Sequence, residues 1–205
     1  MTIGMLQGNY QKFDLTIKES FKWISAINSL ASTDRKLSNE DIFYSYEYGF
    51  LKIFTGWERF VEQTFIAYMT GRNIKGRVHK TFIKKINTDH ALRLLSGTGP
   101  YPDWTRFDEI YKLAELYFID HEALILPLKE IDTKFNDIKK IRNSIVHMST
   151  AAREKFQGLL RANLSSYRID MTAGEFLSER RTGRKTFFEY YVSYLETAAA
   201  KLTPI

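Results

Sequence analysis

The sequence predicts an all-α helical bundle. Apolar side chains recur every three or four residues along most of the chain, and no segment alternates between apolar and polar residues for long. The chain has only four prolines, and no Gly/Ser-rich linker, internal repeat or low-complexity tract divides it. We therefore expect a single helical domain over residues 1–205, a length that can bury a hydrophobic core without disulfides or metals.

The first third of the chain predicts two long helices. Residues 10–31 carry apolar side chains at helical spacing, and the polar stretch TDRKLSNED follows them. From Asp41 to Met69 a second helix is expected, capped at its start by Ser38 together with Asp41 and ended by Gly71. Its apolar stripe is rich in aromatic residues: Phe43, Tyr46, Phe50, Phe54, Trp57, Val61, Phe65 and Tyr68.

The remainder of the chain predicts shorter helices and one further long one. A brief helix is expected from a Thr88 cap to Gly97, and the loop GTGPYPDW follows it. The segments RFDEIYKLAELYFI and ALILPLKEIDTKFNDIKKIRNSIVHM both contain helical stripes. Helices are also expected at residues 152–162, after a capping box of Thr172 and Glu175, and at about 184–202.

The amino-acid composition of the chain excludes several kinds of site and of protein. The chain has no cysteine, which excludes thiolate catalysis, disulfides and cysteine-bound zinc. No run of about 18 apolar residues occurs, so no membrane span is expected, and the N-terminal residues do not resemble a signal peptide. We expect a cytoplasmic protein. The formal charge of +6 is compatible with a nucleic-acid or acidic partner, but many soluble basic proteins bind nothing anionic.

The stretch KKIRNSIVHMST, residues 139–150, is the most informative segment. On a helical wheel, Asn143 and His147 lie together on the face nearly opposite to the stripe of Ile138, Ile141, Ile145 and Met148. Arg142 lies at the border between these faces. His147 is therefore expected to face solvent or a second chain. In one interpretation, His147 stabilises the helix end through the negative end of the helix dipole. In the other, His147 belongs to a functional site.

The motif R-N-x-x-x-H, from Arg142 to His147, resembles the signature of the HEPN superfamily. The segment GWERFVEQTF at residues 56–65, in the long second helix, is similar to what several HEPN subfamilies have there. The resemblance covers a HEPN-like core at about 38–202, with residues 1–37 as an N-terminal helix and linker. It implies a HEPN-like helical bundle with additional short helices, and a homodimer whose two motifs form a composite active site.

The resemblance also implies an activity. Active HEPN members are ribonucleases that need neither a metal nor a cofactor, which would make Arg142, Asn143 and His147 the catalytic residues of an endoribonuclease in toxin–antitoxin or antiviral (abortive infection) defence. The residue types suit this chemistry, because a histidine transfers protons near neutral pH and an arginine holds a phosphate bidentately. Some HEPN toxins carry a tyrosine two positions after the histidine, where a partner enzyme modifies it, whereas this chain has Ser149.

Other charged residues are candidates for supporting roles. Glu58 and Glu62 orient Arg142, or they are solvated, or they form ordinary ion pairs with Arg59 or a neighbouring helix. His79, His90 and His121 are scattered, without the spacing of a metal site, and are expected on the surface or in loops. The basic residues are candidate contacts for RNA phosphates, with a solvated surface as the alternative: Lys139, Lys140, Arg180, Arg181, Arg184 and Lys185.

Two further hypotheses remain open beside the ribonuclease. The chain is alternatively a non-catalytic HEPN domain that binds RNA, a nucleotide or a protein partner. The last hypothesis is an unrelated helical adaptor protein in which the R-N-x-x-x-H motif occurs by chance. Under the ribonuclease hypothesis, RNA is the substrate, and an antitoxin or a defence-system protein is an expected partner.

Overall fold

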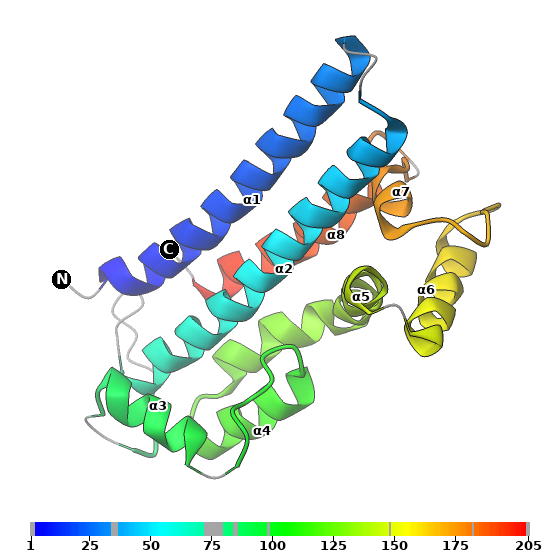
Figure 1. The fold of residues 1–205 in the computed structure, drawn as a ribbon. Coiled ribbons are helices and arrows are strands. Elements are labelled where there is room, and N and C mark those ends of the chain that lie inside the picture. The colour runs from blue at the N-terminus through cyan, green and yellow to red at the C-terminus, as the bar shows by residue number, and fades with distance from the viewer. Residues whose placement is uncertain are drawn as a thin grey trace. The chain divides into compact units, whose positions relative to one another are not determined.

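A computed structural model shows that the protein is all-α, as predicted. It describes residues 3–33, 37–71, 80–83, 86–97, 99–147, 149–181 and 183–203, with the side chains from residue 6 onward. Eight helices occur in these described residues (Figure 1). They are α1 (Ile3–Thr33), α2 (Asn39–Met69), α3 (Thr88–Ser96), α4 (Phe107–Tyr117), α5 (Glu122–Val146), α6 (Thr150–Asn163), α7 (Ala173–Ser178) and α8 (Phe187–Leu202).

The chain divides into two compact units. Unit 1 comprises Met1–Asp14, Gly56–Asp132 and Leu195–Ile205, and unit 2 comprises Leu15–Thr55 and Thr133–Tyr194. Each unit combines segments that are distant in the sequence, and the long helices α1, α2, α5 and α8 contribute residues to both. The single domain over residues 1–205 stays a prediction.

Unit 1 is built around aromatic side chains of α2. Phe65 is fully buried, and its ring centroid lies 5.3 Å from that of Trp104 and 5.1 Å from that of Phe118. Trp57 is also fully buried and packs 5.8 Å from Phe13 of α1. Each such ring removes a large apolar area from water, so the aromatic stripe predicted for α2 supplies much of this core.

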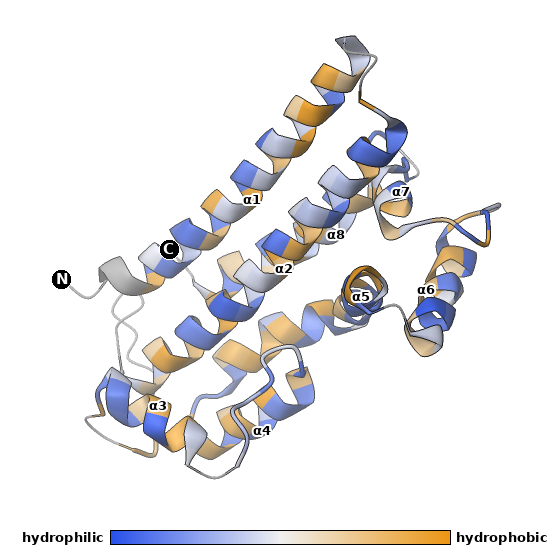
Figure 2. Cartoon of the chain, viewed as in Figure 1, coloured by the Kyte–Doolittle hydropathy of each residue, from blue (hydrophilic) through white to orange (hydrophobic). Residues whose placement is uncertain are grey.

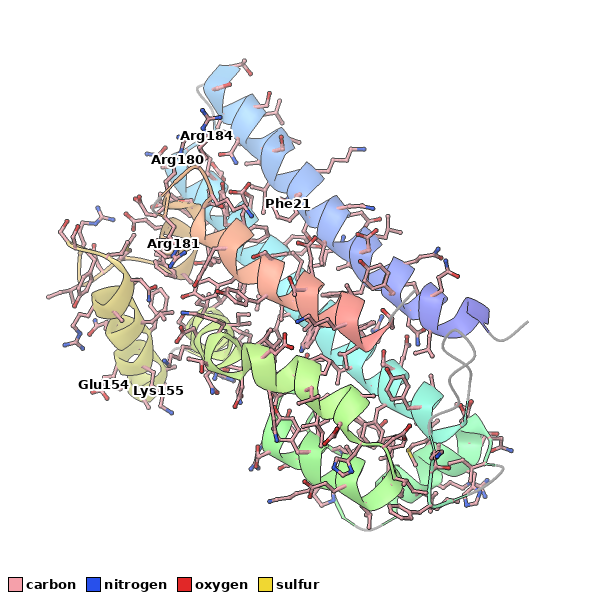
Figure 3. All side chains as sticks on the ribbon, turned by 180° about the vertical axis from the view of Figure 1, so that it is seen from behind. Phe21, Glu154, Lys155, Arg180, Arg181 and Arg184 are labelled. Atoms are coloured by element: carbon pink, nitrogen blue, oxygen red, sulfur yellow. The ribbon has the colours of Figure 1, made fainter. Side chains whose placement is uncertain are left out.

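Unit 2 has its own aromatic core. Phe188 of α8 is buried and meets Phe21 of α1 edge to face at 5.2 Å and Tyr46 of α2 at 5.6 Å. Phe21 lies on the side of α1 that faces α8 (Figure 3). Phe176 of α7 stacks on Phe187 at 4.3 Å, which attaches the short helix α7 to α8. Most helices carry both hydrophobic and hydrophilic residues in each turn, as expected of helices with one buried face (Figure 2).

The predicted helix ends are largely confirmed. The Ser38 hydroxyl accepts a hydrogen bond from the backbone N–H of Asp41 at 3.3 Å, and the Asp41 carboxylate accepts one from the backbone N–H of Ser38 at 2.8 Å. This reciprocal capping box satisfies two donors that the helix itself leaves unpaired. Gly71 follows α2 with a φ of 62°, a conformation that glycine adopts without steric cost.

Three predicted boundaries are wrong. The first helix begins at Ile3 and not at residue 10. The cap of α3 is Asn87 and not Thr88, because the Asn87 side chain accepts a hydrogen bond from the N–H of His90. The last helix begins at Phe187 and not near residue 184, because Thr186 and Glu189 form a capping box there. Sequence spacing alone does not separate neighbouring polar residues that can all cap a helix. In the part of the chain that is described, no helix combines the length and apolar character needed to span a membrane.

Candidate functional site

Helix α5 carries the R-N-x-x-x-H motif to its C-terminal end. Ile138 and Ile141 are fully buried, so this face of α5 belongs to the core, as predicted. Ile145 is only half-buried, and Met148 lies outside the described residues. His147 follows the last residue of α5 and is exposed, which agrees with its predicted position away from the core stripe.

The three motif side chains are in direct contact. The Nη1 atom of Arg142 donates a hydrogen bond to the Oδ1 atom of Asn143 at 3.1 Å. The same Nη1 atom lies 3.1 Å from the Nε2 atom of His147. The guanidinium carbon of Arg142 lies 5.6 Å from the centroid of the Phe54 ring on α2, within the range of a cation–π interaction. Arg142 is therefore held between a buried aromatic ring and two polar partners.

The contact between Arg142 and His147 is a hydrogen bond in only one arrangement of the imidazole protons. A guanidinium has only donors, so a hydrogen bond at this distance requires Nε2 to be the acceptor. In that arrangement the imidazole proton is on Nδ1. When an anion draws the guanidinium away, the lone pair of Nε2 is released. The arrangement can thus deliver a phosphate-binding cation and a proton acceptor to the same place.

A cavity of about 440 Å³ lies beside His147 within unit 2. It is lined by residues from α2, from the end of α5, from α6 and from the segment before α7. Apolar and polar side chains both contribute to its walls, among them Tyr44, Glu47, Ile145, His147, Arg153 and Gln157. A cavity of this size and mixed character is typical of small-molecule sites.

The N-terminus of α7 and the side of α2 shape this cavity. The N–H of Gly174 donates a hydrogen bond to Oε1 of Glu47 at 2.9 Å. A Cβ atom added at Gly174 would lie 2.2 Å from the carbonyl oxygen of Phe43, so only glycine fits this close approach. Burial raises the pKa of the Glu47 carboxyl above its ordinary value, and the hydrogen bond from Gly174 offsets part of the rise.

The predicted basic residues of α5 have different surroundings. Lys140 forms an ion pair with Asp137, with 2.9 Å between Nζ and Oδ1. Lys139, one position earlier, is half-exposed. Both side chains belong to the same unit as Arg142. Lys140 already has a carboxylate partner, which a phosphate would have to displace.

The basic segment before α8 presents its side chains in more than one direction (Figure 3). Arg180, Arg184 and Lys185 are exposed. Arg181 instead stacks on Tyr190, with its guanidinium carbon 3.8 Å from the ring centroid. Arg181 therefore contributes to packing on α8, whereas the three exposed residues are free to meet an anionic ligand.

The two glutamates considered as supports for Arg142 belong to unit 1, whereas Arg142 belongs to unit 2. Glu62 accepts a hydrogen bond from the hydroxyl of Tyr101 there. Burial and this carboxylate together raise the pKa of Tyr101 well above its ordinary value. Glu62 thus has a partner of its own, and the orienting role of Glu58 and Glu62 stays a prediction.

The other histidines are placed on separate elements. His90 is exposed in the first turn of α3, His121 is half-exposed just before α5, and His79 lies outside the described residues. Among the residues that the structure describes, no group of three or more His, Asp or Glu side chains is arranged to hold a metal ion.

Sequence reasoning missed several residues that surround the motif. Phe54 was assigned only to the core stripe of α2, although its ring also supports Arg142. Glu47 and Arg153 line the cavity beside His147 but showed no motif or spacing that links them to it. The sequence separation between Glu47 and Gly174 is 127 residues, so no local pattern could have revealed their contact.

Comparisons with protein-family models, with curated proteins and with solved structures find no match for this chain.

Proposed function

We propose that this chain is a metal-independent endoribonuclease of the HEPN type that cleaves RNA through attack of the 2′-OH. The observation that carries the proposal is the contact of 3.1 Å between Arg142 and His147, with Asn143 bonded to the same guanidinium nitrogen. The motif, its position at the end of a long helix and the exposure of His147 also support it.

The proposed reaction assigns one role to each motif residue. An RNA phosphate draws the Arg142 guanidinium away from His147, and the guanidinium then stabilises charge on the phosphate oxygens. Nε2 of His147 accepts the proton of the 2′-OH, the 2′-oxygen bonds to phosphorus, and the bond to the 5′-oxygen breaks. The leaving 5′-oxygen takes up a proton from water, and the His147 imidazolium returns its proton to the solvent. The products are a 2′,3′-cyclic phosphate and a 5′-OH end, and Asn143 positions Arg142.

We further propose a homodimer in which two sets of Arg142, Asn143 and His147 face each other. The isolated chain leaves His147 exposed, which is compatible with a second copy approaching this face. A cytoplasmic role in toxin–antitoxin or antiviral defence, with an antitoxin or defence-system protein as partner, belongs to the same proposal. The cavity beside His147 equally supports the second candidate, a non-catalytic HEPN domain that binds RNA or a nucleotide.

The deciding experiment compares the wild-type protein with His147→Ala on end-labelled single-stranded RNA in excess EDTA. We expect wild-type cleavage with cyclic phosphate ends, no cleavage of DNA, and a loss of roughly 10²–10⁴-fold in the variant, the usual contribution of a positioned proton-transfer group. His90→Ala removes another exposed histidine and should retain full activity. Cleavage that stops on chelation, survives His147→Ala or leaves 3′-OH ends would refute the proposal.

A further inference from the structure

The cavity beside His147 has the features of a nucleobase site. Its volume of about 440 Å³ lies in the range of small-molecule pockets, and His147 itself forms part of its wall. Tyr44 also lines it, and this side chain is 63% exposed although it is large and aromatic. An exposed ring beside an open cavity offers a flat face on which a base can stack.

Three polar side chains of the cavity, Glu47, Gln157 and Ser144, offer hydrogen-bond acceptors. Glu47 accepts the Gly174 N–H through Oε1, which leaves Oε2 and the second lone pair of Oε1 available. Gln157 donates its amide Nε2 to the carbonyl of Ile169 at 3.3 Å, which leaves its Oε1 atom as an acceptor. The Ser144 hydroxyl donates to the carbonyl of Ile141, so its oxygen offers only lone pairs to a ligand.

These three acceptors favour a base edge that carries donors. Guanine presents two adjacent donors, N1–H and the N2 amino group, which match the two oxygens of a carboxylate. Adenine and cytosine each offer one amino group next to a ring nitrogen acceptor. Uracil offers one N–H between two carbonyl oxygens. In all three bases, the acceptor beside the donor would face a carboxylate oxygen and be repelled by it. Of the four bases, guanine therefore fits Glu47 best.

A cation is also present for the phosphate of such a nucleotide. Arg153, near the start of α6, lines the same cavity as His147 and Glu47. It is exposed and forms no ion pair with any residue that the structure describes. A base held at Glu47 and a phosphate held near His147 and Arg153 would together occupy one cavity.

We propose that this cavity binds a guanine base of the RNA, with Tyr44 stacking on the base and Glu47 accepting its N1–H and N2–H donors. The proposal rests on the ribonuclease function proposed above and deepens it, because it makes the guanosine beside the scissile phosphate the preferred substrate. Glu47 and Tyr44 then act as specificity-determining residues.

The test is calorimetric titration of the full chain at low salt with the 3′-monophosphates of guanosine, inosine, adenosine, cytidine and uridine. Inosine lacks only the N2 amino group, so it isolates one hydrogen bond to the carboxylate. We expect guanosine 3′-monophosphate to bind about tenfold or more tightly than the inosine compound, as the loss of a charged hydrogen bond predicts. The other three nucleotides should bind more weakly still.

Two substitutions sharpen this test. Glu47→Gln retains an acceptor for Gly174 but places an amide group where guanine needs an acceptor, so it should abolish the preference for guanosine over inosine. Tyr44→Ala should weaken binding of every nucleotide roughly tenfold by loss of stacking. Tyr48→Ala is the matched control, because Tyr48 is 60% exposed on the same helix but does not line this cavity. Melting temperatures verify that the variants are folded.

Equal affinity for guanosine and inosine, a preference that survives Glu47→Gln, or no nucleotide binding at millimolar concentration would each overturn the guanine site. If the cavity instead receives a side chain of a partner protein, no nucleotide should bind at millimolar concentration. The titration does not require cleavage. Guanosine selectivity without RNA cleavage would refute the proposed ribonuclease but support the guanine site. RNA cleavage without guanosine selectivity would support the ribonuclease but refute the guanine site.

Discussion

The Nη1 atom of Arg142 lies 3.1 Å from the Nε2 atom of His147, five residues further along the chain. This distance joins the first and last residues of the motif in one hydrogen bond. The helix ends between them, at Val146, so the imidazole can turn back toward the guanidinium. The first prediction tests whether this pair has a function beyond holding the helix end.

Substitution of Arg142 should remove activity and host toxicity together. If the protein is a defence ribonuclease, its expression alone should slow host growth, and Arg142→Ala should relieve this. Arg142→Lys keeps the positive charge but loses the planar fork that holds a phosphate bidentately, so it should also be strongly impaired. Colony counts after induction and cleavage rates of labelled RNA measure the two effects.

The melting temperature is the control for these variants, because Arg142 is half-buried over Phe54 and its loss also removes packing. Lys112→Ala removes an exposed cation from α4 in unit 1 and should leave toxicity unchanged. Equal toxicity of wild type and a folded Arg142→Ala variant would remove the argument for Arg142 as a catalytic residue.

The motif face should be covered by a second copy in solution. Light scattering at tens of micromolar should give twice the mass of one chain. Val146, beside His147, is apolar and 47% exposed, so Val146→Lys should place a charge in the interface and favour the monomer. Leu116→Lys changes a residue of α4 that is 62% exposed and should leave the dimer intact. A monomeric wild-type protein would contradict the composite active site.

The exposed basic residues before α8 should bind RNA electrostatically. Arg184→Ala and Lys185→Ala should weaken RNA binding and reduce the steepness of its salt dependence by about 0.7 per lost phosphate contact on a single strand. Arg181→Ala should in addition lower the melting temperature, because Arg181 stacks on Tyr190. Filter binding across a salt series measures the slope. An unchanged slope in both Arg184→Ala and Lys185→Ala would assign these side chains to a solvated surface.

Two glycines should respond oppositely to the same substitution. Gly174→Ala would bring a Cβ atom to 2.2 Å from the backbone of α2, so it should lower the free energy of unfolding by about 3 kcal/mol. Gly158 lies inside α6, and apart from its chain neighbours and the nearby backbone of its own helix no atom lies within 4 Å of an added Cβ. Gly158→Ala should therefore raise the free energy of unfolding by about 0.5–1 kcal/mol. Urea denaturation of both variants provides the comparison. A neutral Gly174→Ala would mean that α7 does not approach α2 this closely.

The sequence by itself determined the helical class, most helix positions and the face on which the motif lies. These features depend on local periodicity: residues three and four apart share one face of a helix wherever that helix packs. The buried Ile138 and Ile141 and the exposed His147 follow from this rule. The capping box of Ser38 and Asp41 is equally local.

Only the tertiary structure decided what surrounds the motif. The ring of Phe54 under Arg142, the contact of Glu47 with Gly174 and the stacking of Arg181 on Tyr190 join different elements of the fold. Such contacts depend on how helices approach one another, and the spacing of residues within one helix carries no record of its neighbours. The cavity beside His147 is therefore a property of the packed helices, because four separate segments of the chain must converge to form it.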